Sequence, residues 1–318
     1  MDLLEFSRGD DAALAGAQLS RTIATTHVRE MRRRSAAVLR TADVDLLNVE
    51  RGTVPPDPIR DIFGAGVIEQ PDGLRPVVVV HERLAQTPAP RERLPALSDL
   101  PEVVERLSAV GADIPRSDTV VLALPPTRPQ YGPGRHVRAS GANGTLGARV
   151  VTADGREAIL TAGHVVTAGD VARNAADQLA DCIFSIDPAQ VPAAQVAADV
   201  AVLVPHLPTA WSPGVPISGA CTARAGDRVD LSGSVSGQQT SRVVGAMPEY
   251  WLSATSGLWA SVLITAEGFS TEGDSGGPVT AQGTTELVGH LVGGSGAVTS
   301  FVQTLDVQLS VSGVALQV

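Results

Sequence analysis

The hexapeptide Gly-Asp-Ser-Gly-Gly-Pro at residues 273–278 has an order that a simple turn would not need. Ser275 offers a hydroxyl that can attack a carbonyl carbon, and such an attack also needs a base and donors aimed at the developing oxyanion. Gly273 lets the chain turn so that its own N–H and that of Ser275 point at one spot, while Gly276 and Gly277 leave room for a substrate. The loop therefore predicts a nucleophile at Ser275 and an oxyanion hole at Gly273 and Ser275.

The base that takes the serine proton must come from elsewhere in the chain, and His164 is the candidate. It follows the apolar run of residues 158–161 in a turn of small residues, so its imidazole is expected at the end of a strand. Histidine is the usual general base of enzymes. For His164 taken alone, a helix-capping or core histidine is the alternative.

A neutral imidazole base needs an acidic partner that fixes its tautomer and stabilises its charged form. Asp199 is the one charge in the apolar run of residues 196–204. Burial of that carboxylate without a partner would be costly, so we expect Asp199 to pair with His164. Four other aspartates in more polar surroundings are rivals: Asp170, Asp177, Asp181 and Asp187.

The order His164, Asp199, Ser275, within the motifs TAGHV, DVAVL and GDSGGP, resembles the trypsin-like (chymotrypsin-fold) serine peptidases. Residues 226–237 and 287–294 are also similar to strands of that family's second barrel. The resemblance covers residues 141–318 and implies a mainly β fold of two antiparallel six-stranded β-barrels with the site in the cleft between them. It implies that Ser275 is the nucleophile of a peptidase, His164 its base and Asp199 the acid that orients His164. No metal or organic cofactor is implied.

The same resemblance places the substrate pocket. The family's deciding position, six residues before the serine, is Phe269, and Val292, Gly293 and Gly294 are expected to line the other wall. None of these residues is charged, so we expect a small or apolar side chain at the P1 position of the substrate. His290 would suggest an acidic P1 side chain, as in glutamate-specific members, but strand alternation places it outside the pocket.

Secreted members of the family are activated when a new N-terminus pairs with the aspartate before the serine, here Asp274. No activation sequence of that type stands near residue 140. We therefore expect an arginine to pair with Asp274 in the uncut chain, with Arg138, Arg149 and Arg242 as candidates.

The residues before the barrels are expected to form a smaller α/β region. Residues 9–41 have helical periodicity, residues 64–70 and 75–84 read as a β-hairpin around Asp72 and Gly73, and residues 99–110 read as a short helix followed by a strand. The Pro- and Gly-rich residues 125–136 read as a linker. We expect an N-terminal region at residues 1–138 and a peptidase domain at 139–318. The N-terminal motifs resemble intracellular trypsin-like proteins with such an extension.

Composition and charge limit the partners and the cellular location that we expect for the protein. The net charge is −10, and of 24 basic residues, all arginine, four follow residue 156, which argues against nucleic acid as a partner. No run of about 18 uncharged apolar residues and no export signal is seen, so we expect no membrane partner and a cytoplasmic location. The two cysteines are consistent with a cytoplasmic location, although the sequence does not decide whether they form a disulfide with each other.

Three hypotheses follow for the whole chain. The first is a serine endopeptidase acting on proteins or peptides. The second is a latent protease or recognition module that a regulatory protein activates by docking on residues 1–138. The third is that these residues form a pro-segment that the protein itself removes.

Overall fold

The computed structural model describes residues 11–42, 61–85, 94–112, 114, 118–124, 137–139, 142–190, 198–208, 211, 215–252, 257–295 and 297–318. Side chains of the long N-terminal helix are described as far as residue 29. The predicted linker at residues 125–136 lies outside the described residues. Strands dominate the fold, as the sequence predicts.

The N-terminal unit, residues 11–124, consists of a long helix, a hairpin, a short helix and a third strand. Its elements are α2 (Asp11–Ala42), β1 (Ile62–Gln70), β2 (Gly73–His81), η1 (Glu82–Leu84), η2 (Leu97–Asp99), α3 (Pro101–Ala109) and β3 (Val120–Leu124). The predicted hairpin is confirmed: β1 and β2 are antiparallel and turn at Gly73, whose φ of +123° favours glycine. β3 then pairs in parallel with β2.

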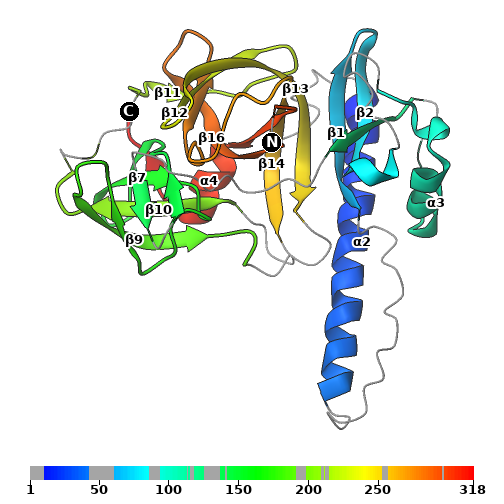
Figure 1. Cartoon of the computed structure of the whole chain (residues 1–318), viewed down its shortest axis with the longest axis horizontal. Helices are drawn as coiled ribbons and strands as arrows, with labels where there is room; N and C mark the ends of the chain where they lie inside the picture. Colours follow the sequence, from blue (N-terminus) through cyan, green and yellow to red (C-terminus); the bar gives the residue numbers. More distant parts are fainter. Residues whose placement is uncertain are drawn as a thin grey trace.

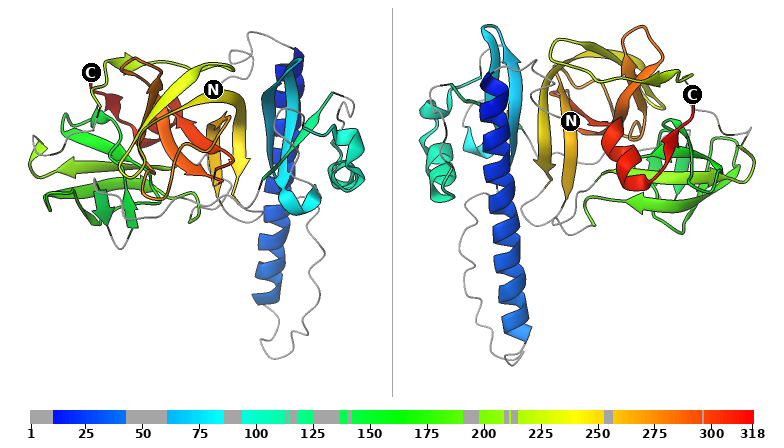
Figure 2. Two further views of the ribbon diagram at one scale, coloured as in Figure 1. Left: turned by 45° about the horizontal axis from the view of Figure 1, so that its top comes forward. Right: turned by 180° about the vertical axis from the view of Figure 1, so that it is seen from behind.

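Helix α2 lies against the hairpin and extends past it (Figures 1 and 2). Leu19 and Ile23 on its inner face are buried with Val78 and Val80 of β2. The helix approaches β1 so closely that a Cβ at Gly16 would lie 2.9 Å from the carbonyl carbon of Gly66. This close packing ties α2 to the sheet.

The first β-unit is an eight-stranded sheet of short strands. The strands are β4 (Val137–Ala139), β5 (Ala142–Gly144), β6 (Arg149–Val151), β7 (Glu157–Thr161), β8 (Val171–Arg173), β9 (Leu179–Ile186), β10 (Val200–Pro205) and the C-terminal β18 (Ala315–Leu316). Their pairings follow the order β18-β6-β7-β10-β9-β8-β4-β5. The count exceeds the expected six by two, and one of the two additional strands is β18, which the C-terminus adds beside β6.

The second β-unit contains a closed ring of six strands. Its strands are β11 (Gly219–Ala220), β12 (Arg228–Gly233), β13 (Gly237–Trp251), β14 (Leu258–Thr265), β15 (Pro278–Ala281), β16 (Glu286–Gly294) and β17 (Ser300–Thr304). The pairing of β12 with β13 closes the ring β12-β15-β16-β17-β14-β13, which matches the predicted six-stranded barrel. The strand β17 continues into helix α4 (Leu305–Ser312).

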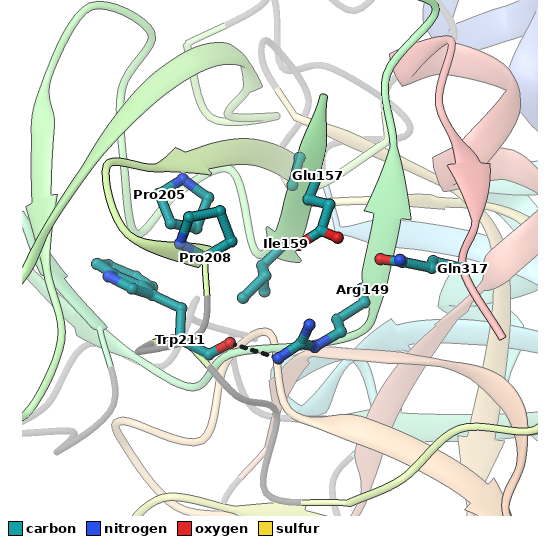
Figure 3. Close-up of a pocket in the computed structure, with 8 residues that line it drawn as sticks. Arg149, Glu157, Ile159, Pro205, Pro208, Trp211 and Gln317 are labelled. Carbon is teal, nitrogen blue, oxygen red and sulfur yellow. Dashed lines mark hydrogen bonds between the residues drawn. The ribbon is translucent and has the colours of Figure 1, made fainter. Parts of the chain in front are cut away.

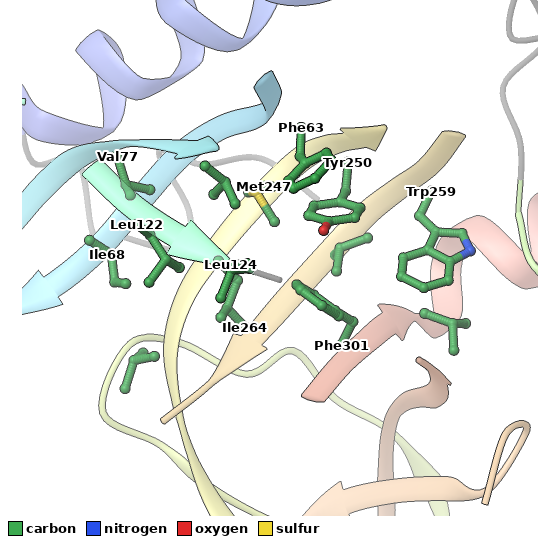
Figure 4. Packing of buried hydrophobic residues seen from close by; sticks show 14 of the residues in the cluster. Phe63, Ile68, Val77, Leu122, Leu124, Met247, Tyr250, Trp259, Ile264 and Phe301 are labelled. Carbon is green, nitrogen blue, oxygen red and sulfur yellow. The ribbon is translucent and has the colours of Figure 1, made fainter. Parts of the chain in front are cut away.

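The N-terminal unit continues the sheet of the second β-unit. Strand β1 pairs antiparallel with β13, and Figures 1 and 2 show the second β-unit between the first β-unit and the hairpin. The two parts share one hydrophobic core, in which Phe63 of β1 and Leu122 of β3 pack with Tyr250, Trp259 and Phe301 (Figure 4). The sequence predicted a boundary at residue 138. The N-terminal unit before it and the second β-unit after it bury apolar surface together.

Candidate active site

His164 and Asp199 lie side by side at the ends of two paired strands. His164 stands in the turn after β7, and Asp199 directly precedes β10. The His164 Nδ1 and Asp199 Oδ2 atoms are 2.7 Å apart, and the backbone N–H of His164 donates to Asp199 Oδ1 over 3.0 Å. Since a carboxylate only accepts, Nδ1 carries the imidazole proton and Nε2 is the basic nitrogen. Both side chains are 0% exposed, so this expected pair is present and buried.

The other contacts of Asp199 come from the second β-unit and α4. The Asp199 N–H donates to Gln303 Oε1 over 2.8 Å, and Gln303 in turn donates to the carbonyl of Ala260. Gln308 Nε2 donates to the Asp199 carbonyl over 3.3 Å. The indole N–H of Trp259 donates to Asp199 Oδ2 over 3.2 Å. These donors and acceptors come from across the boundary between the two units.

Ser275 lies on the second β-unit, in the loop before β15, and its backbone meets the turn that contains His164. The N–H of Thr145 donates to the Ser275 carbonyl over 2.8 Å. A Cβ at Gly144 would lie 2.7 Å from Val165 Cγ2 and 2.9 Å from the Ser275 oxygen. Val165, which follows His164, and the backbone of Ser275 therefore both lie against Gly144. This contact brings Ser275 into the same region as the pair of His164 and Asp199.

The loop around Ser275 is held in a conformation that requires glycine. Gly273 has φ of +97° and Gly276 has φ of +86°, values that side-chain-bearing residues rarely adopt. The Gly273 carbonyl accepts from Thr145 Oγ1 over 2.9 Å and from Ser234 Oγ over 2.8 Å. These two bonds fix the peptide between Gly273 and Asp274, which lies along the chain between the two N–H groups of the predicted oxyanion hole.

The Asp274 carboxylate is fully buried and bonds to three backbone N–H groups. Its Oδ1 accepts from Val235 over 2.9 Å and from Ser236 over 3.1 Å, and its Oδ2 accepts from Thr271 over 2.9 Å. Backbone donors of this kind compensate the loss of water around a buried carboxylate. We call this set of three donors the Asp274 amide nest.

The prediction that an arginine pairs with Asp274 is wrong. Each candidate binds another group: Arg138 pairs with Asp177, Arg149 donates to the Trp211 carbonyl over 3.0 Å, and Arg242 pairs with Glu69. Figure 3 shows Arg149 beside a small cavity that Glu157 and Gln317 also line. The prediction failed because backbone donors, which the sequence does not display, already hold the carboxylate.

The four predicted pocket residues do not all lie together. Phe269 is buried in the interior of the second β-unit with Leu291 and Val302, whereas Val292 packs in the cluster of Trp259. Gly293 faces the edge of the Trp259 indole, since a Cβ there would lie 2.5 Å from Cη2. Gly294 ends β16, opposite Ser300. The side chains of Phe269 and Val292 thus belong to two separate hydrophobic clusters.

His290 is buried, and its ring nitrogens bond to groups of the first β-unit and α4. Its Nε2 accepts from the N–H of Ala148 over 3.0 Å, and its Nδ1 lies 2.6 Å from Gln308 Oε1. Burial lowers the pKa of His290 to about 4, against the opposing effect of the Gln308 bond, so the imidazole is neutral near pH 7. Both ring nitrogens of His290 are therefore engaged inside the protein.

The rival aspartates have other surroundings. Asp177 pairs with Arg138, and Asp181 pairs with His206 over 3.0 Å. The Asp187 carboxylate accepts from the N–H of Ala189, and burial, followed by the charge of Asp199, raises its pKa. The carboxylate in hydrogen-bond contact with the His164 ring is that of Asp199.

Several residues at the site had no role in the sequence interpretation, among them Thr145, Trp259, Gln303 and Gln308. Gln303 lies in the segment SFVQTL, residues 300–305, where Ser300 and Thr304 are polar as well, so it does not stand out as Asp199 does in its apolar run. The bonds that join these residues to Asp199 or Gly273 span at least 60 residues along the chain, so local sequence pattern does not indicate them.

Among the described residues, no helix is both long and apolar enough to cross a bilayer. Both cysteines, Cys182 and Cys221, are free thiols, so the bridge that the sequence left open is not formed.

No family model and no curated protein matches this sequence. Solved structures similar to it are chymotrypsin-fold serine proteases. A Nocardiopsis protease (NAPase) is 22% identical over 58% of this chain and 97% of its own, with a TM-score of 0.47. Thermobifida fusca protease A is 19% identical over 57% of this chain and 96% of its own, with a TM-score of 0.46. A glutamic acid specific serine protease that uses a histidine triad in substrate binding is 20% identical over 58% of this chain and 99% of its own, with a TM-score of 0.44.

Proposed function

We propose that the protein is a serine endopeptidase whose catalytic triad is Ser275, His164 and Asp199. The observation that carries the proposal is the buried pair of His164 and Asp199, with its 2.7 Å contact, in a turn that meets the backbone of Ser275. A buried carboxylate on Nδ1 leaves Nε2 basic, which is what proton removal from a serine requires.

The proposed reaction has two stages. Ser275 Oγ attacks the scissile carbonyl carbon while His164 Nε2 takes the hydroxyl proton, and the N–H groups of Gly273 and Ser275 stabilise the oxyanion. His164 then gives that proton to the leaving amine, and the acyl-enzyme forms. Water, deprotonated by His164, hydrolyses this ester in the second stage. Asp199 remains ionised throughout and stabilises the imidazolium.

The Asp274 amide nest supports a competent loop in the uncut chain. In this interpretation, the backbone N–H groups of Val235, Ser236 and Thr271 replace the new N-terminus that activates secreted relatives. Activity should therefore not require cleavage of the chain before residue 139.

We propose a small or apolar P1 preference for the substrate. The support comes from the sequence, in which the four residues predicted for the pocket, Phe269, Val292, Gly293 and Gly294, are uncharged, although Phe269 and Val292 pack in two separate clusters. His290, the residue that would suggest an acidic preference, bonds to Ala148 and Gln308 instead. A peptide-library cleavage profile tests the preference, and dominant cleavage after Glu, Lys or Arg would contradict it.

Replacement of the nucleophile tests the proposal as a whole. Ser275→Ala should abolish both peptide hydrolysis and labelling by a fluorophosphonate probe, because the probe forms its bond with an activated serine oxygen. Ser241→Ala is the matched control, since Ser241 is also a buried serine but lies on β13. Equal labelling of the wild-type protein and Ser275→Ala would refute the proposal.

A second candidate function, a latent protease, has its own supporting observation. Ser275 is 0% exposed and so is the side chain of His164, which leaves the pair without contact to solvent. A substrate can reach these groups only after a local opening, and a protein that docks on residues 1–138 is the proposed trigger. Prompt probe labelling of the isolated full-length protein favours the constitutive enzyme, and labelling that appears only with a partner favours latency.

We also propose a domain boundary at residue 138 and a cytoplasmic location for the protein. The shared core of Phe63 and Leu122 with the second β-unit supports a lasting structural role for the N-terminal unit rather than a removable pro-segment. Intact mass after prolonged incubation, compared with Ser275→Ala, tests self-removal. Fractionation of cells that make the protein tests its location.

A further inference from the structure

The Trp259 indole makes a contact with the proposed catalytic carboxylate that the triad itself does not require. Its Nε1–H donates to Asp199 Oδ2 over 3.2 Å, the same oxygen that lies 2.7 Å from His164 Nδ1. Trp259 comes from β14 of the second β-unit, whereas Asp199 and His164 belong to the first. The contact therefore couples the carboxylate to a different part of the molecule.

Packing holds the indole in this position. Trp259 is 0% exposed and lies in an aromatic group with Tyr250, at a ring-centroid distance of 5.7 Å, and Phe301, at 5.9 Å. Its other edge rests against Gly293, where a Cβ would lie 2.5 Å from Cη2. Figure 4 shows the nitrogen on the side of the indole that faces away from Tyr250 and Phe301. The ring thus has a fixed orientation with its one polar atom directed out of the aromatic group.

We propose that Trp259 is a positioning residue of the catalytic site, which keeps Asp199 Oδ2 in the orientation that His164 needs. The inference rests on the proposed peptidase function. With the His164 N–H on Oδ1 and the imidazole and indole N–H groups on Oδ2, the buried carboxylate receives three donors. Removal of the indole donor lets the carboxylate rotate and leaves one donor fewer on the oxygen that binds the imidazole.

Trp259→Phe is the first test, because phenylalanine keeps most of the ring and removes the N–H. A hydrogen bond to a charged group has an energy that corresponds to a rate change of about 10- to 100-fold, and we expect a fall of that size in kcat with little change in KM. The carboxylate that loses a donor also attracts the imidazolium more strongly. The acidic limb of the kcat/KM profile should therefore move to higher pH, which a loss of packing alone would not cause.

Trp211→Phe is the matched control. Trp211 is also 0% exposed, and its indole nitrogen has no hydrogen-bond acceptor among the described residues. The control makes the same chemical change in a buried tryptophan whose indole N–H does not bond to Asp199, so its kcat and pH profile should stay at the wild-type values. Equal kinetics for the two variants would overturn the role of Trp259.

A measurement without any Trp259 substitution covers the case in which Trp259→Phe fails to fold. The chain has three tryptophans, so the indole N–H region of a proton–nitrogen NMR spectrum holds three signals. Asp199→Asn removes the acceptor charge and should shift the Trp259 signal while the Trp211 signal stays in place. An unmoved Trp259 signal would overturn the proposal, whatever the activity. Absence of probe labelling in the wild-type protein under all conditions would instead refute the peptidase function on which the role depends.

Discussion

A side chain at position 233 should break the amide nest that holds Asp274. Gly233 ends β12, and a Cβ there would lie 2.5 Å from Asp274 Cγ and closer still to Oδ1. The carboxylate has no easy way to move, because it is fully buried and Val235, Ser236 and Thr271 donate to it. Gly233→Ala should therefore displace the carboxylate from the two donors on Oδ1.

The size of the effect follows from those two bonds. Each hydrogen bond to a charged group contributes about 1.5–3 kcal/mol, so loss of both should lower the free energy of unfolding by about 3 kcal/mol or more. For a chain of this size that corresponds to a fall in Tm of about 4 °C or more. The peptide of Gly273 should move with Asp274, and loss of one oxyanion donor typically costs about 100- to 1000-fold in kcat.

Thermal unfolding and the rate of fluorophosphonate labelling measure the two effects. Gly219→Ala is the control, since a Cβ at Gly219 would meet nothing within 4 Å. Control and wild type should melt within about 2 °C of each other, because a Gly to Ala change at an unstrained position alters stability by about 0.4–1 kcal/mol. If Gly233→Ala matches Gly219→Ala in Tm and labelling rate, the reasoning about the nest is refuted.

Three further predictions concern other parts of the molecule. Burial lowers the pKa of His290 to about 4, so the unfolded chain binds a proton there below about pH 6.5 while the folded protein does not. His290 should then contribute a fall of about 3 kcal/mol in the free energy of unfolding as the pH drops from 6.5 to 4. His290→Gln should flatten this slope in denaturant titrations at pH 7 and 4.5, and an unchanged slope would contradict the assignment. Phe63→Ala removes a ring from the core shared by the N-terminal unit and the second β-unit, and should lower the free energy of unfolding by about 3 kcal/mol. One cooperative transition is expected by calorimetry, whereas two separate transitions would show that the parts unfold independently. Burial raises the pKa of the Cys182 thiol to about 11, so a thiol reagent at pH 8 should modify the less buried Cys221 first and Cys182 only on unfolding. Equal rates for the two thiols in the folded protein would count against this burial.

The features that could be predicted from the sequence are those that depend on local residue pattern or on the energetic cost of burying a charge. The helix, the hairpin at Gly73 and the strand before His164 follow from periodicity and turn residues. Asp199 was identified as the partner of His164 because a charge in an apolar run needs a partner, and the 2.7 Å contact satisfies that need. The glycines of residues 273–278 predicted the conformation of the serine loop, because glycine adopts positive φ values that other residues rarely adopt.

Tertiary structure decided how the groups at the site are held. The donors to Asp274 are backbone amides of Val235, Ser236 and Thr271, and any residue except proline carries an amide, so no residue type could indicate them. The expected arginine failed for that reason. The Trp259 contact with Asp199 and the pairing of β1 with β13 also join segments far apart along the chain. Such contacts depend on how strands pack, which local hydrophobic pattern does not specify, and they determine how firmly the carboxylate, the imidazole and the serine loop are positioned.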